Sequence, residues 1–117
     1  MKYYYNGKLI RTSNHVYTHA VLTPDGKVIG CRNGLANAQR AKDAERGMAN
    51  NDRRDAEAAI KALRAGRSFY FYHVGRMQYK HTFTAADTVE KYERIIRWAE
   101  AVNAEVDTYI IVELEAR

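Results

Sequence analysis

The first third of the chain alternates apolar and polar residues around two turn motifs, which predicts two β-hairpins. The dipeptide NG at positions 6–7 is typical of a two-residue type I′ turn and would place Tyr3 opposite Ile10. The sequence TPDG is a second turn motif, and it would join strands over residues 16–22 and 27–31. The pattern therefore predicts an antiparallel meander at the N-terminal end.

The middle of the chain changes to a helical pattern. Residues 35–65 are rich in Ala, Glu, Lys and Arg, and their few apolar residues recur at helical spacing. Gly47 and Asn51 interrupt this pattern, so one kinked helix and a pair of helices are both compatible with it, and Asn51 would cap a second helix starting at Asp52. A further amphipathic helix is expected over residues 85–103, where the sequence TAAD resembles a capping box, and a final strand follows.

Between these helices, residues 69–83 alternate on both sides of Gly75-Arg76, which suits a type II′ turn and predicts a third hairpin. The alternation sorts the side chains onto two faces. One face is apolar and aromatic and is expected to belong to the core, through Tyr70, Tyr72, Met77, Tyr79 and Phe83. The other face mixes aromatic rings with hydrogen-bonding groups, from Phe69, Phe71, His73, Gln78 and Lys80.

These elements predict an α+β fold in which an antiparallel sheet built from hairpins packs against two main helical segments. A length of 117 residues suits a single domain spanning residues 1–117. Whether residues 35–65 form one helix or two, and which face of the third hairpin is exposed, are left open by the pattern.

Composition points to a binding protein with an anionic partner. The formal net charge is +5, and nine Tyr residues favour a binding surface, because tyrosine combines a large apolar ring with a polar hydroxyl. The basic residues are interleaved with acidic ones rather than gathered in a block. This distribution favours a local anionic site over a long surface that follows nucleic acid.

A search for reactive groups finds no catalytic constellation and no metal cluster. His15 and His19 are expected on a strand and too far apart to share a metal easily. Cys31 has no partner for a disulfide and is expected to be a small buried apolar residue, which suits a reducing cytoplasm. We therefore expect no enzyme activity and no cofactor. The N-terminus has no apolar segment of the signal-peptide type, and no apolar run is long enough for a membrane span.

What remains is recognition chemistry on the mixed face of the third hairpin and on the last helix. Aromatic rings can stack on a nucleobase, and guanidinium or ammonium groups can bind its phosphates. The candidate ligand-binding residues are Phe69, Phe71, His73, Arg76, Gln78, Lys80, Arg94 and Arg97. The alternatives are that this face packs under a helix or forms a subunit interface.

The segments KYYYNGKLIRTSN, YTHAVL and GKVIGC, with the later order of helix, strands, helix and strand, resemble the first type of Thoeris anti-defence proteins of bacteriophages. That family sequesters a cyclic ADP-ribose signal of bacterial immunity without cleaving it. The resemblance implies an oligomer with ligand pockets between protomers, acting in the host cytoplasm. None of the family's ligand residues can be placed on this chain.

Residues and resemblance together favour a non-catalytic protein that sequesters a small cyclic nucleotide signal, of the cyclic ADP-ribose or cyclic oligonucleotide type. It would act as a dimer or higher homo-oligomer and would not associate with membranes. Two alternatives stay open. One is a viral inhibitor that acts by protein–protein contact, of the anti-CRISPR type, and the other is a small nucleic-acid-binding module.

Overall fold

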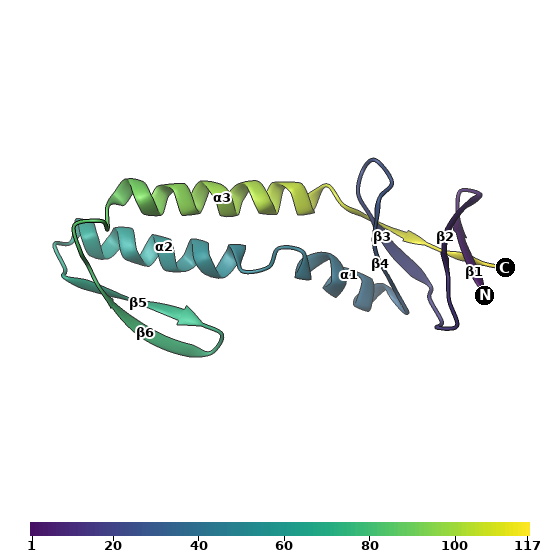
Figure 1. Cartoon of the computed structure of the whole chain (residues 1–117), viewed down its shortest axis with the longest axis horizontal. Helices are drawn as coiled ribbons and strands as arrows, with labels where there is room; N and C mark the ends of the chain where they lie inside the picture. The colour runs from purple at the N-terminus through teal and green to yellow at the C-terminus, as the bar shows by residue number, and fades with distance from the viewer. The chain divides into compact units, whose positions relative to one another are not determined.

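Three helices and eight strands make up the protein in its computed structural model, which describes residues 1–117 (Figure 1). The α+β class is confirmed, and all strand pairs are antiparallel. The strands are divided among three small sheets, where the sequence pattern predicted one sheet. The chain forms two compact units, one from Met1–Arg46 with Ala104–Arg117 and the other from Gly47–Asn103. No helix combines the length and the apolar character needed to cross a membrane.

The first unit contains two three-stranded sheets and a short helix. One sheet has the order β2-β1-β8 and consists of β1 (Lys2–Tyr5), β2 (Lys8–Thr12) and β8 (Glu115–Ala116). The other has the order β4-β3-β7 and consists of β3 (His19–Leu22), β4 (Val28–Arg32) and β7 (Ile110–Glu113). Helix α1 (Leu35–Ala44) packs Ala38 and Ala41 against Val21 of the second sheet.

The register of the first hairpin follows the turn for two residues and then shifts. Tyr5 pairs with Lys8 as predicted, but Tyr3 pairs with Arg11 because of an irregularity between Tyr3 and Tyr4, so the predicted pairing of Tyr3 with Ile10 is wrong. A bulge adds a residue to one strand and cannot be seen in an alternation pattern. Tyr3 is buried, and its hydroxyl donates to the main-chain oxygen of His15 at 2.6 Å.

Cys31 lies in the core of the second sheet, as expected for a lone cysteine. Its side chain packs with Ala20, Leu22 and Val112, and only 1% of its surface is exposed. Burial raises the pKa of the Cys31 thiol, because the thiolate would lose its hydration there. Cys31 is thus an apolar core residue in this fold.

The second unit contains α2 (Ala49–Arg64), β5 (Phe69–Val74), β6 (Met77–Thr82) and most of α3 (Val89–Asp107). Residues 35–65 therefore form two helices, α1 and α2. The unit's core joins Ala56, Ala59 and Ile60 of α2 to Tyr92 of α3, with Tyr70 of β5 packed against them. Figure 1 shows α2 between α3 and β5 within this unit.

Both predicted helix starts are wrong by a few residues. Helix α2 begins at Ala49, and Asn51 lies inside its first turn, where its amide is used for a contact with β5. Helix α3 begins at Val89, and the hydroxyl of Thr88 accepts the N–H of Lys91 in the position of an N-cap. In TAAD the Asp87 carboxylate accepts the N–H of Thr84, which is one bond of a capping box, but the Thr84 hydroxyl accepts the N–H of Ala86 instead of that of Asp87, and the motif closes a turn before the helix.

Asp87, in that turn, is the most heavily bonded side chain of the second unit. Its carboxylate is 2% exposed and accepts hydrogen bonds from the Tyr92 hydroxyl at 2.6 Å, the Lys91 ammonium at 3.2 Å and the Thr84 N–H at 2.8 Å. The Nε2 atom of His81 lies 3.0 Å away. These donors, the Tyr92 hydroxyl first, hold the pKa of Asp87 well below its usual range. The cluster therefore joins the base of the third hairpin to the start of α3.

Candidate ligand-binding pocket

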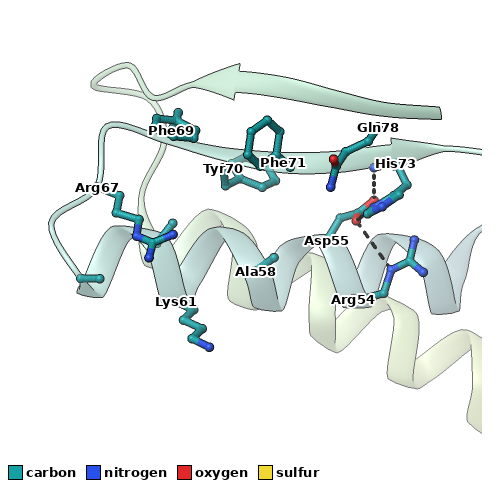
Figure 2. A pocket seen from close by; sticks show the side chains of 12 residues that line it. Arg54, Asp55, Ala58, Lys61, Arg67, Phe69, Tyr70, Phe71, His73 and Gln78 are labelled. Carbon is teal, nitrogen blue, oxygen red and sulfur yellow. Dashed lines mark hydrogen bonds and ion pairs between the residues drawn. The ribbon is translucent and has the colours of Figure 1, made fainter.

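A pocket of about 450 Å³ opens between α2 and β5 inside the second unit (Figure 2). This volume lies in the range of small-molecule sites, roughly 300–1,000 Å³. Helix α2 and the loop after it contribute Arg54, Asp55, Ala58, Lys61, Ala62, Ala65 and Arg67. The hairpin contributes Phe69, Tyr70, Phe71, His73 and Gln78.

The helical wall of the pocket follows from the spacing of small and charged residues in α2. Arg54, Ala58, Lys61, Ala62 and Ala65 recur at intervals of three or four, which places them on one side of the helix. Alanine side chains reach only one carbon from the backbone, so they allow a strand to approach closely and leave room beside it. Arg54 lies before these alanines and Lys61 lies between Ala58 and Ala62, and both cations border the resulting space.

His73 attaches β5 to α2 at three points. Its main-chain N–H donates to Oδ2 of Asp55 at 3.0 Å, and its main-chain oxygen accepts from the amide of Asn51 at 3.1 Å. Its ring Nδ1 lies 3.1 Å from Oδ1 of Asp55, whose carboxylate is almost completely buried. These bonds satisfy polar groups on the edge of β5, which has a strand neighbour on one side only.

The aromatic wall of the pocket is formed by Phe69 and Phe71. The two rings meet edge to face with their centroids 5.5 Å apart. Phe71 keeps 46% of its surface exposed, which is unusual for a side chain so large and apolar. The ammonium of Lys80 lies 4.3 Å from the centroid of the Phe69 ring, a cation–π contact. The pocket therefore offers an exposed aromatic surface beside positive charge.

Charge is distributed unevenly between the two ends of the pocket. Arg54 lies 3.8 Å from a carboxylate oxygen of Asp55 and donates to Asn51. Lys61 and Arg67 make no ion pair, and no side-chain hydrogen bond satisfies them. Figure 2 shows Arg67 near Phe69 at one end of the pocket and Asp55 at the opposite end, with Lys61 on the Arg67 side and its side chain drawn pointing away from the hairpin. One end is therefore cationic and uncompensated, and the other is rich in hydrogen-bonding groups.

Four of the eight candidate ligand residues lie together in this pocket, namely Phe69, Phe71, His73 and Gln78. The other four do not line it. Arg76 lies in the hairpin turn, Lys80 covers the Phe69 ring, Arg94 pairs with Glu90 at 2.8 Å, and Arg97 is exposed on α3.

The residues that sequence reasoning missed are the polar ones on α2 and in the following loop, Arg54, Asp55, Lys61 and Arg67. A signal for two of them, Arg54 and Lys61, was present in the sequence. Arg54, Ala58 and Lys61 follow each other at spacings of four and three residues and share one helical face, so a small residue between two cations on that face could have been predicted. Asp55 could not be found in this way, because its role depends on a bond to a residue 18 positions later.

The predicted core face of the third hairpin is only partly covered. Tyr70 stacks on Phe83 with a centroid distance of 5.4 Å and packs into the core of the unit, as predicted. Met77 is 61% exposed and Tyr79 is also exposed, so their assignment to the core is wrong. The pairing across the hairpin is the predicted one at every position, from Phe69 with Thr82 to Val74 with Met77. Contacts with α2 are made along β5 as far as His73, whereas most of β6 is exposed.

Comparison with family models, with curated proteins and with solved structures finds no match to this chain.

Proposed function

We propose that the protein binds a small anionic ligand of the nucleotide class in the pocket between α2 and β5 and holds it without converting it. The observation that carries this proposal is the exposed Phe71 ring in the same pocket as Lys61 and Arg67, two cations without an anionic partner. A flat base can stack on the ring, and phosphate oxygens can compensate the cations. A pocket that offers both an exposed aromatic ring and cations suits a nucleotide better than an uncharged ligand.

The specific form of the proposal is capture of a cyclic nucleotide immune signal by a bacteriophage protein in the host cytoplasm. A cyclic ADP-ribose combines an adenine ring with a pyrophosphate, and a cyclic oligonucleotide combines bases with phosphodiesters. Both ligand types carry the ring and the negative charge that the pocket suits. The resemblance of the first thirty residues to a family of nucleotide sponges supports this choice.

We also propose that the protein acts as a homo-oligomer. In the second unit, four large apolar side chains outside the pocket are about half exposed or more, those of Met48, Val74, Met77 and Trp98. Aromatic and methionine side chains exposed in this way are enriched at protein interfaces. Light scattering that gives a monomer at micromolar concentration would remove this part of the proposal.

A second candidate function rests on the same exposed side chains. An inhibitor that acts by protein–protein contact would use Trp98 and Met77 as anchors in a partner's pockets. This candidate needs no small ligand and predicts that nucleotides have no effect on the protein.

One experiment separates these functions. The protein is incubated with cyclic ADP-ribose isomers, cyclic oligonucleotides and linear mononucleotides, and binding is followed by calorimetry. The complex is then denatured and the released ligand is identified by mass spectrometry. Recovery of intact ligand supports capture, and recovery of a chemically altered ligand shows that the protein is an enzyme. Binding of RNA with steep salt dependence would favour a nucleic-acid module. If no nucleotide binds, the protein–protein inhibitor is the function that remains.

A further inference from the structure

The geometry points to His73 as the residue that selects the ligand's ring. We propose that Nε2 of His73 accepts a hydrogen bond from an amino group on the bound heterocycle, so that the pocket prefers adenine-type nucleotides to their 6-oxo counterparts. This inference rests on the proposed function. It goes further by naming the chemical group that is read and the atom that reads it.

The contact with Asp55 sets the tautomer of His73. Nδ1 lies 3.1 Å from Oδ1 of Asp55. An ionised carboxylate can only accept hydrogen bonds, so Nδ1 must carry the proton in this contact. In the neutral imidazole the other nitrogen, Nε2, is then an acceptor. Asp55 therefore decides what kind of group Nε2 can bind.

His73 is also held in place before any ligand arrives. Asp55 and Asn51 bind its main-chain N–H and oxygen, and Asp55 also binds its ring. Nε2 is the one polar atom of His73 without a partner in the structure. An acceptor fixed in this way loses little conformational entropy on binding, which is the condition for a strong and selective contact.

A second hydrogen-bonding group lies beside His73 in the pocket. Gln78 is the cross-strand partner of His73, and Figure 2 shows the Gln78 amide turned toward the same end of the pocket as the His73 ring. An amide both donates and accepts, so it can pair with a ring nitrogen next to an amino group. The edge of adenine presents this combination, an amino donor beside a ring acceptor.

The cationic end of the pocket lies at a distance from His73. His73 and Phe69 are four residues apart on β5, which corresponds to about 13 Å along a strand. Arg67 lies near Phe69 in Figure 2, with Lys61 on the same side of the pocket. A ligand that spans the pocket therefore carries its acidic group well away from the amino edge. Adenine nucleotides have this layout, with a sugar between base and phosphate.

The tautomer is tested without any ligand. Long-range proton–nitrogen NMR spectra at pH 8.5 distinguish the two neutral forms of histidine, and His73 is assigned by its loss in His73→Phe. We expect His73 to be protonated on Nδ1. His15, which is exposed, is the control, and we expect it to show a weaker preference between the two neutral forms. A proton on Nε2 of His73 would overturn the inference while leaving the proposed function intact.

The selectivity is tested with three ligands that differ at one ring position, namely AMP, IMP and purine riboside 5′-monophosphate. We expect AMP to bind about tenfold more tightly than either of the others, the size of one buried hydrogen bond. His73→Phe keeps the ring area and should remove this preference. Asp55→Asn can reverse the tautomer and should shift the preference toward IMP.

The outcomes distinguish failure of the His73 contact from failure of the proposed function. Equal binding of all three nucleotides overturns the inference and supports the proposed function. A preference for AMP that survives in His73→Phe also overturns it, because another residue would then be responsible. Binding of none of these nucleotides or of their cyclic relatives refutes the proposed function, and the inference fails with it. Circular dichroism of both variants checks that they are folded.

Discussion

The carboxylate of Asp55 on α2 accepts two hydrogen bonds from His73 on β5, one from the main-chain N–H at 3.0 Å and one from the ring at 3.1 Å. One buried side chain thus holds both the backbone and the imidazole of a residue in the neighbouring strand. The contact closes one end of the pocket. Together with the bond that the Asn51 amide donates to the main-chain oxygen of His73, it holds β5 against α2.

Asp55→Ala should therefore destabilise the second unit. The main-chain N–H of His73 would lose its partner in a poorly hydrated position, which costs about 2–3 kcal/mol. Urea denaturation followed by circular dichroism measures the loss. Glu100→Ala is the control, because Glu100 is exposed and makes no ion pair, and it should change the free energy of unfolding by less than about 0.5 kcal/mol. Equal stability of the Asp55 variant and the wild type would show that this contact contributes nothing.

Phe71→Ala should weaken nucleotide binding and leave the fold intact. Stacking of a base on an aromatic ring contributes about 1–3 kcal/mol, so the dissociation constant should rise about tenfold or more. The exposure of Phe71 means that little core packing is lost. Trp98→Ala is the matched control, since Trp98 is similarly exposed in the same unit and lies outside this pocket. A larger loss of binding for Trp98→Ala than for Phe71→Ala would place the ligand elsewhere.

The double variant Lys61→Gln with Arg67→Gln should reduce both affinity and its dependence on salt. Each cation that contacts a phosphate contributes to the salt dependence of binding, so their removal should flatten a plot of affinity against ionic strength. Calorimetry between low and physiological salt gives this slope. Arg97→Gln is the control, because Arg97 is exposed on α3 and does not line the pocket. An unchanged slope in the double variant would contradict the assignment of the cationic end.

Acid should destabilise the protein through Asp87. Its pKa in the folded protein is held well below the ordinary value of 3.8 by the hydroxyl of Tyr92 and the other donors around it. The unfolded chain therefore binds a proton more readily, and the stability that Asp87 contributes is complete above about pH 5 and falls as the pH decreases below 4. Asp87→Asn should be less stable at pH 7 and should lose less stability between pH 5 and pH 3 than the wild type. Urea denaturation at each pH provides the comparison, and parallel profiles would rule out this role.

The Cys31 thiol should not react with a disulfide reagent in the folded protein. It is 1% exposed, and burial raises its pKa, so little thiolate is present and the reagent cannot reach it. Absorbance at pH 8 should show no release of chromophore from native protein and one equivalent in urea. Rapid reaction of the native protein would mean that the core of the first unit opens readily.

Local features of the sequence predicted the local structure well. The turn at Gly75-Arg76 set the pairing of the whole third hairpin, because a two-residue loop sets the first pair and no bulge shifts the register after it, unlike in the first hairpin. The helical composition of residues 35–65 was likewise sufficient to predict helix there. It could not decide between one helix and two, because Gly47 and Asn51 are compatible with either arrangement.

The sequence by itself thus determined the class of the fold, the third hairpin and the aromatic half of the candidate site. Tertiary structure decided which hairpin residues are covered and which cations meet the aromatic rings. Both depend on where α2 lies against β5, and that position is set by small side chains and by the bonds from Asp55 and Asn51 to His73. Alternation along a strand shows that the strand has two faces. Which face is buried depends on contacts between residues about twenty positions apart in the sequence, and the alternation does not show these contacts.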